Sequence, residues 1–310
     1  MKKFNFGTKK WFGMTSLAAM LVLGACSSGG GASTGAAGSG SESASLGDQV
    51  DHKIIGIDPG AGIMNATQKA ITDYGLNDWT LIEGSGAAMT ATLDKAIKKE
   101  DPIVITGWTP HWMFSKYDLK YLEDPKKSYG DAEEIHTIAR KGLEQDHPEA
   151  YQFLSNFKWT EDEMGELMIA IQDGTPAEQA AKDFVAAHPE RVAEWTDGIT
   201  PASGDTVTLA YVAWDSEIAS FSLVQEIMQE KLGLTVKGLQ VEAGPMWLGV
   251  AQGDADASLA AWLPLTHADY WGQYKDKLDD LGANMTGVKT GLVVPAYVDA
   301  TSIEDMVDAK

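Results

Sequence analysis

The sequence predicts an α/β protein with two similar lobes, and three observations lead to this. Apolar runs and helical patterns alternate as β-α-β-α-β in the first half of the chain, and the same order returns in the second half. Each unit closes on an apolar run ending in Trp, with Pro two residues later: Trp108 and Pro110, then Trp262 and Pro264. Such alternation is typical of parallel sheets covered by helices. A length of 310 residues suits two domains.

The composition limits the functions that the chain can have. A formal net charge of −21 argues against nucleic acid as a partner, because binding a polyanion needs a basic patch. Six His and one Cys have no ligand-like spacing, so no metal site is predicted. No catalytic motif or dinucleotide-binding motif is present, so we expect neither an enzyme nor a cofactor.

The first 51 residues are expected to precede the fold, which should begin near His52. Residues 1–25 carry four Lys and no acid before an apolar run too short to span a membrane, which is typical of a signal peptide. The following LGAC motif resembles the bacterial lipobox, so Cys26 is expected to carry lipid; ordinary cleavage beside a stray Cys is the alternative. Residues 26–51 are rich in Gly, Ser and Ala and predict a flexible, lipid-anchored linker.

The first α/β unit is predicted over residues 52–195 and includes a helical extension. Its strands are expected at 53–58, 79–83 and 102–107, and its helices at 63–74 and 87–99. The extension is expected to form four helices, at 131–141, 149–156, 161–172 and 177–187. Thr160 with Glu163, and Thr175 with Glu178, have the spacing of a capping box at the start of the last two.

A linker at 196–204 should lead to the second unit, residues 205–310. Its strands are expected at 206–212, 235–241, 257–261 and 286–298, and its helices at 218–231, at 246–252 and from Ser302. The boundaries of the two lobes stay open, because segments can cross between them.

Three Trp residues follow a predicted strand where it gives way to a loop: Trp108, Trp214 and Trp262. Any single Trp can be a core residue, and Trp79 and Trp195 are interpreted in that way. Ligands of parallel sheets bind outside the carboxyl ends of the strands, so we expect the three rings to converge on the cleft. Indole faces attract cations, and a quaternary ammonium, which has no N–H to donate, suits such a box.

A Gly-rich turn, DPGAGIM at 58–64, precedes the helix that starts near Gly62. The free N–H groups of that helix start favour a carboxylate or a phosphate. His267, five residues after Trp262, is a further candidate donor, although a lone His is also compatible with a structural role. A cation box beside an anion socket indicates a zwitterionic ligand.

With these motifs, the sequence resembles the glycine betaine-binding lipoproteins of osmoprotectant ABC importers in Gram-positive bacteria. The similarity extends from Lys53 to the C-terminus, and the order of the two units resembles a circularly permuted subset of that family. The matching runs are IIGIDPGAGIM (54–64), TGWTPHWMFSKYDLKYLEDPKKSYGDAEEIHTIARKG (106–142), LAYVAWDSEIAS (209–220), VEAGPMW (241–247) and ASLAAWLPLTH (257–267).

The resemblance implies a fold and a set of site residues. The fold is the type II, periplasmic-binding-protein-like one, in which two lobes with mainly parallel sheets close on a ligand in the cleft between them. The implied site consists of a trimethylammonium cage, Trp108, Trp214 and Trp262, and of carboxylate ligands, the backbone amides of Gly62 and Ile63 and the side chain of His267.

The resemblance also implies a function. The protein is expected on the extracytoplasmic face of the cell membrane, where it captures glycine betaine and related betaines such as proline betaine. It would deliver them to the permease and ATPase components of an importer. Carnitine and choline are alternative ligands, although choline has no carboxylate for the Gly62–Ile63 socket. A surface glycoside hydrolase is the other alternative; it needs a carboxylate pair facing the cleft, from acids such as Asp58, Asp215 or Glu217.

Overall fold

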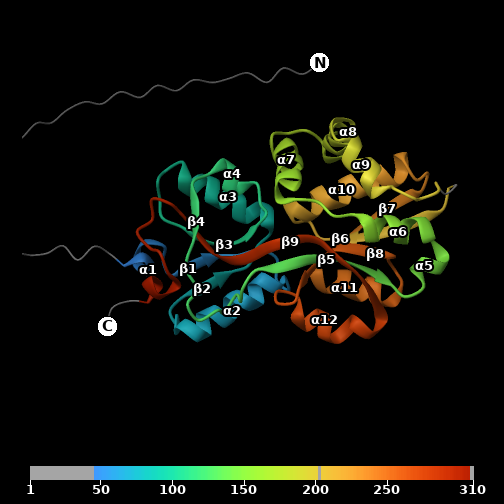
Figure 1. Cartoon of the computed structure of the whole chain (residues 1–310). Helices are drawn as coiled ribbons and strands as arrows, with labels where there is room; N and C mark the ends of the chain where they lie inside the picture. The colour runs from blue at the N-terminus through green and yellow to red at the C-terminus, as the bar shows by residue number, and fades with distance from the viewer. Residues whose placement is uncertain (1–44, 202–203, 308–310) are drawn as a thin grey trace, which may run out of the picture. The chain divides into compact units, whose positions relative to one another are not determined.

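The computed structural model describes residues 45–201 and 204–307 (Figure 1). The predicted signal peptide, Cys26 and most of the predicted linker lie outside the described residues. The described chain begins earlier than the expected start at His52, with the short helix α1 (Leu46–Gln49). Ser45 caps α1 by accepting the N–H of Asp48, and Leu46 is buried. No helix of the described ranges is long and apolar enough to cross a membrane.

The first lobe is built on three parallel strands, β1 (Lys53–Ile55), β2 (Thr80–Ile82) and β3 (Val104–Thr109), in the order β2-β1-β3. The helices α2 (Gly62–Tyr74) and α3 (Gly86–Ile97) connect them. Gly75 ends α2 in the left-handed conformation, with φ of 68°, which favours glycine. The predicted strands and helices of this lobe are confirmed, with ends that differ by a few residues.

The second lobe repeats the plan with parallel strands β6 (Thr206–Tyr211), β7 (Thr235–Gln240) and β8 (Ala257–Leu263), in the order β7-β6-β8. The helices α10 (Asp215–Glu230) and α11 (Ala243–Gln252) connect them. In both lobes an antiparallel strand lies next to the third parallel strand: β9 (Leu278–Pro295) beside β3, and β5 (Glu133–Arg140) beside β8. The predicted repeat of two α/β units is therefore confirmed.

One long strand joins the two lobes. β9 pairs with β5 in the second lobe and then with β3 in the first, and Figure 1 shows it running from one lobe into the other. The result is a continuous strand order, β2-β1-β3-β9-β5-β8-β6-β7, with β4 (Leu119–Tyr121) also paired to β9. The strand predicted at 286–298 thus starts earlier, at Leu278, because its first part pairs with β5.

The helix predicted over 131–141 is wrong, because this segment forms the strand β5. Its Glu, Ala and Arg residues favour a helix locally, yet β5 lies between β8 and β9 and is paired on both sides. Pairing with two neighbours and burial of alternate side chains, among them Glu133 and Ile135, outweigh the weak local preference.

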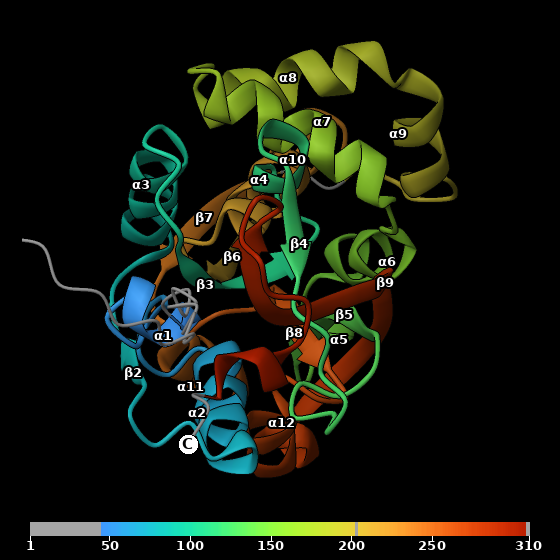
Figure 2. The ribbon, with the colours of Figure 1, turned by 90° about the vertical axis from the view of Figure 1, so that its left-hand side faces the viewer.

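The rest of the extension is helical, as predicted, and lies in the second lobe. It consists of α5 (Leu143–Asp146), α6 (Pro148–Asn156), α7 (Glu161–Gln172), α8 (Ala177–Ala187) and α9 (Pro189–Trp195). Figure 2 shows α7, α8 and α9 together beside α10, against which α7 and α8 pack. Trp195 is buried there, and Trp79 is buried in the first lobe, as expected of core residues.

One of the two predicted capping boxes is confirmed. Thr160 and Glu163 form it at the start of α7. The second is wrong, because Pro176 takes the N-cap position of α8 and Glu178 becomes its second helical residue, one short of the position that a capping box needs. The remaining elements are α4 (Met113–Lys116), α12 (Ala268–Tyr274), and the 3-10 turns η1 (Lys275–Lys277) and η2 (Ile303–Met306).

Candidate ligand-binding site

A cavity lies where the carboxyl ends of strands from both lobes meet, with an empty volume of about 290 Å³ including its open mouth. All six residues predicted for the cage and the anion socket line it. The complete lining is Ile57, Ala61, Gly62, Ile63, Trp108, Trp214, Trp262, Thr266, His267 and Thr290.

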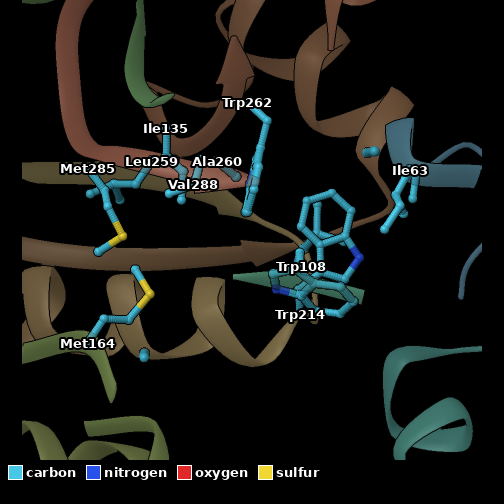
Figure 3. Close-up of a cluster of buried hydrophobic side chains, with 14 of the residues drawn as sticks. Ile63, Trp108, Ile135, Met164, Trp214, Leu259, Ala260, Trp262, Met285 and Val288 are labelled. Carbon is cyan, nitrogen blue, oxygen red and sulfur yellow. The ribbon is translucent and has the colours of Figure 1, made fainter. Parts of the chain in front are cut away.

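The three indoles come from corresponding places in the two lobes. Trp108 lies near the end of β3 and Trp262 near the end of β8, and each is followed by a cis peptide bond, Thr109–Pro110 and Leu263–Pro264. Trp214 follows β6 and is the N-cap residue of α10. Figure 3 shows the three rings close together, with Ile63 across from them. Each ring is at most 6% exposed, so its face is removed from bulk water.

Two of the indoles are oriented by hydrogen bonds that cross between the lobes. Trp214 Nε1 donates to Asp58 Oδ1 at 2.8 Å, and Trp108 Nε1 donates to Ser216 Oγ at 3.3 Å. His111 packs edge-on against Trp108, with ring centroids 4.6 Å apart, and its Nε2 lies 3.3 Å from Asp215 Oδ2. Because the N–H groups of Trp108 and Trp214 are both used in these hydrogen bonds, the faces of the two rings are left for a ligand.

His267 lines the cavity and has one ring nitrogen available as a donor. Its Nδ1 accepts the backbone N–H of Trp262 at 3.1 Å, and this bond assigns the proton of the neutral ring to Nε2. Burial lowers the pKa of His267 to about 3, so the ring is neutral at ordinary pH. Nε2 is buried and has no hydrogen-bond partner within the described part of the chain. The ring therefore holds one free N–H beside the three indoles.

The start of α2 provides further donors opposite His267. Its N-cap residue, Ala61, makes no side-chain cap, so the first N–H groups of this helix of 13 residues, at Gly62 and Ile63, are not satisfied by a cap. Only glycine fits at position 62, because a Cβ there would lie 2.0 Å from the backbone oxygen of Thr266. The second lobe thus packs directly against this helix start.

Glu133 holds the turn that carries Thr266 and His267. Its carboxylate accepts the N–H of Thr266 at 2.9 Å and of Leu265 at 3.3 Å, and it also bonds the Thr266 hydroxyl. Burial raises the pKa of Glu133, against the opposing effect of these bonds. Sequence reasoning missed this residue, because its segment was predicted to be a helix.

Four lining residues were not predicted: Ile57, Ala61, Thr266 and Thr290. The first three are sequence neighbours of predicted site residues, and this adjacency could have predicted them as part of the cavity lining. Thr290 has no such signal, because it reaches the cavity only through its pairing with Trp108 across β3 and β9. Its Oγ1 is buried and without a partner among the described atoms.

The acids considered for a hydrolase do not face the cavity. Asp58 is bonded to Trp214, Asp215 lies beside His111, and Glu217 is buried in α10, where burial raises its pKa to about 8. No carboxylate of the described residues lines the cavity, so the pair that glycoside hydrolysis requires is not formed there. Residues 45–201 and 204–307 also hold no group of three or more His, Cys, Asp or Glu able to bind a metal ion.

The chain belongs to the family described as the substrate-binding domain of ABC-type glycine betaine transport systems, whose OpuAC model matches residues 37–187 and 205–310. It is 52% identical over 270 residues to the glycine betaine/carnitine transport binding protein GbuC of Listeria monocytogenes. That alignment covers 86% of this chain and 89% of the relative.

Two solved structures are also similar. Lactococcal OpuAC, in its closed-liganded conformation with glycine betaine, is 49% identical with a TM-score of 0.46. The binding protein ProX of Borrelia burgdorferi is 38% identical with a TM-score of 0.47. The alignments cover 47% and 49% of this chain, and the chain spans 58% of the length of each of the two structures.

Family membership confirms the resemblance seen in the sequence. The chain is a substrate-binding component of an ABC-type transport system, with the two-lobed α/β fold that the resemblance implied. The family is one of transport proteins and not of enzymes.

Proposed function

We propose that this chain captures glycine betaine in the cavity between its lobes and delivers it to the membrane components of an ABC importer. One observation carries the proposal. Three indole faces, the free Nε2–H of His267 and the uncapped start of α2 all line the same cavity. A trimethylammonium group and a carboxylate in one small molecule match this arrangement.

The cage suits the cationic end of the ligand. Methyl groups pack on the faces of Trp108, Trp214 and Trp262, while the positive charge meets their π-electrons. Each such face contributes up to about 2 kcal/mol when it is desolvated. An ammonium that carries N–H groups would need acceptors, and the described side chains of the lining supply no carboxylate.

The socket suits the anionic end. The backbone amides of Gly62 and Ile63 point from a helix start, where partial positive charge favours an anion. Neutral His267 adds one hydrogen bond from Nε2. For a ligand of about eight heavy atoms, these contacts permit a dissociation constant on the order of micromolar or tighter.

Each of the two lobes supplies some of the residues proposed to contact the ligand. Trp108, Gly62 and Ile63 belong to the first lobe, and Trp214, Trp262 and His267 to the second. A ligand that bridges both sets binds the closed arrangement better than an open one, and this difference drives closure. Closure gives the permease a way to distinguish loaded from empty protein.

We also propose that residues 1–25 are removed as a signal peptide and that a lipid on Cys26 holds the protein on the extracytoplasmic face of the membrane, with 26–51 as the tether. The sequence of this region supports the proposal. Cys26→Ser should move the protein from the membrane fraction of its cells to the medium; retention in the membrane fraction would contradict the anchor. Along the sequence, the linker at 196–204 is proposed to divide the folded part into units 52–195 and 205–310. These units are not identical with the lobes, because β5 and the helices α5 to α9 lie in the second lobe and β9 reaches into the first.

Calorimetric titration with glycine betaine tests the function directly. We expect saturable binding of one molecule per chain, and competition by proline betaine. Choline should compete weakly, because it leaves His267 and the start of α2 without a carboxylate. No detectable heat or competition at millimolar glycine betaine would overturn the proposal.

Carnitine is a second candidate ligand. The Listeria relative has carnitine in its name, and Thr290, whose buried Oγ1 has no partner among the described residues, lines the same cavity. The hydroxyl of carnitine would give that atom a hydrogen-bond partner, which glycine betaine does not. Thr290→Val should weaken carnitine binding and leave glycine betaine binding nearly unchanged; equal effects on both would remove this role.

A further inference from the structure

We propose that Asp58 determines the preference of the site for a cationic ligand: its carboxylate, hydrogen-bonded to the edge of Trp214, supplies the negative charge that the cavity lining itself does not carry. This inference rests on the proposed function, because it assumes that the three indoles hold the cationic end of the ligand.

The position of Asp58 connects it to the cage without exposing it to the ligand. It follows Ile57, a lining residue, at the end of the segment that contains β1, and it is only 8% exposed. Its Oδ1 accepts the Nε1–H of Trp214 at 2.8 Å across the two lobes. A carboxylate at this place touches the ring edge and leaves the ring face to the ligand.

The charge of Asp58 is not neutralised by its hydrogen bonds. Its second oxygen, Oδ2, is buried and accepts no hydrogen bond from an N–H or from an alcohol hydroxyl of the described residues. The neighbouring ionisable group is another acid, Glu242, at the N-cap of α11. Burial raises the pKa of Glu242, and the negative charge of Asp58 and a hydrogen bond between the two side chains raise it further. The raised pKa favours a proton on Glu242, so the hydrogen-bonded pair holds its negative charge on Asp58, at the edge of Trp214.

A carboxylate in this position favours a cation in two ways. First, it attracts the positive charge directly over the width of one indole, through a region of low dielectric constant where screening is weak. Second, an indole whose N–H donates to an anion is polarised, so its face becomes more negative and attracts a cation more strongly. Neither effect favours an uncharged group of the same shape. The charge of Asp58 thus discriminates between ligands by charge, while the three rings discriminate by shape.

The test compares two ligands of the same shape. Glycine betaine carries the charged trimethylammonium group, and 3,3-dimethylbutanoate replaces its nitrogen with carbon and is uncharged at that end. Affinities are measured by calorimetry, with the uncharged ligand measured by displacement of glycine betaine. The variant is Asp58→Asn, which keeps an oxygen to accept the Trp214 N–H and removes the charge.

We expect Asp58→Asn to weaken glycine betaine by about tenfold, the size of one partly screened charge at this range. The affinity for 3,3-dimethylbutanoate should stay the same or improve. The factor by which the protein binds glycine betaine more tightly than 3,3-dimethylbutanoate should therefore become smaller. Equal weakening of both ligands would overturn the proposal, since Asp58 would then only support the ring. An unchanged or wider ratio would overturn it as well.

A matched control separates this effect from a general loss of negative charge. Asp94 also accepts a hydrogen bond from an aromatic side chain, Tyr117 Oη at 2.8 Å, but Tyr117, unlike Trp214, does not line the cavity. Asp94→Asn should leave both affinities unchanged. Asp58→Ala, which removes the acceptor as well as the charge, should weaken both ligands, and the difference from Asp58→Asn measures the positioning of Trp214.

The outcomes for Asp58 and for the proposed function are distinguishable. If the unaltered protein binds no glycine betaine, the proposed function fails before any variant is compared. If it binds glycine betaine and the ratio between the two ligands does not narrow in Asp58→Asn, the function stands and the role of Asp58 fails.

Discussion

The backbone oxygen of Thr266, in the second lobe, lies 2.0 Å from the place that a Cβ on Gly62, in the first lobe, would take. Backbone cannot yield to a methyl group at that distance as a flexible side chain can. Gly62 therefore lets the two lobes approach, and it does so at the helix start proposed to bind the carboxylate.

Gly62→Ala should prevent this approach and weaken glycine betaine binding at least tenfold, because the added methyl group separates His267 from the start of α2. Calorimetry and small-angle scattering with ligand would show the lost affinity and a less compact protein. Gly86→Ala is the matched control, since Gly86 is also the first residue of a helix, α3, and its Cβ would meet nothing within 4 Å. Equal affinities in the two variants would contradict the role of Gly62.

Replacing Trp108, Trp214 or Trp262 with Leu should raise the dissociation constant for glycine betaine by about 30-fold each, the equivalent of about 2 kcal/mol for one lost indole face. The measurement is calorimetry on the folded variants. Trp79→Leu serves as the control: Trp79 is buried in the core, where its Nε1 donates to the backbone oxygen of Met306. That variant should lose stability and keep its affinity. Unchanged affinity in all three cage variants would exclude the cage.

The buried His267 should make the protein less stable in acid. Its pKa is lowered to about 3 by burial, whereas an unfolded His titrates near pH 6.5. Between these values the unfolded chain binds a proton that the folded protein does not. The free energy of unfolding should therefore fall as the pH drops through this window, by up to about 1.4 kcal/mol per pH unit from this group. Chemical unfolding of the protein and of His267→Gln at several pH values measures this dependence. If the free energy of unfolding changes with pH equally in both proteins, His267 is not the cause of the acid sensitivity.

Glu217 should act in the opposite direction. Burial raises its pKa to about 8, from 4.5, so the folded protein retains a proton that the unfolded chain loses. The contribution of Glu217 to the free energy of unfolding is therefore complete below about pH 4.5 and is lost as the pH rises to about 8. Glu217→Gln keeps a neutral side chain of similar shape and should be more stable than the unaltered protein at pH 9, by on the order of 5 kcal/mol. Glu230→Gln, at an exposed position of the same helix, should have no such effect.

Much of the site could be predicted from the sequence because its members stand at the ends of regular elements. Trp108, Trp214 and Trp262 each follow an apolar run, and Gly62 starts a helix after a Gly-rich turn. In a parallel sheet the ends of such strands meet at one edge, so local pattern alone brings these residues together. The order of strands and helices in both lobes follows from the same periodicity.

Only the tertiary structure decided what surrounds these residues. The hydrogen bond between Asp58 and Trp214 joins positions 156 residues apart. Thr290 reaches the cavity by its register opposite Trp108, and Glu133 holds Thr266 because β5 is a strand. Each of these depends on which distant segments pair and in which register, and helix or strand preference over a few residues does not contain that information. The sequence by itself determined the six residues proposed for the cage and the socket, because each stands at the end of a regular element. The folded chain added Thr290 to the cavity lining and decided how the six residues are held.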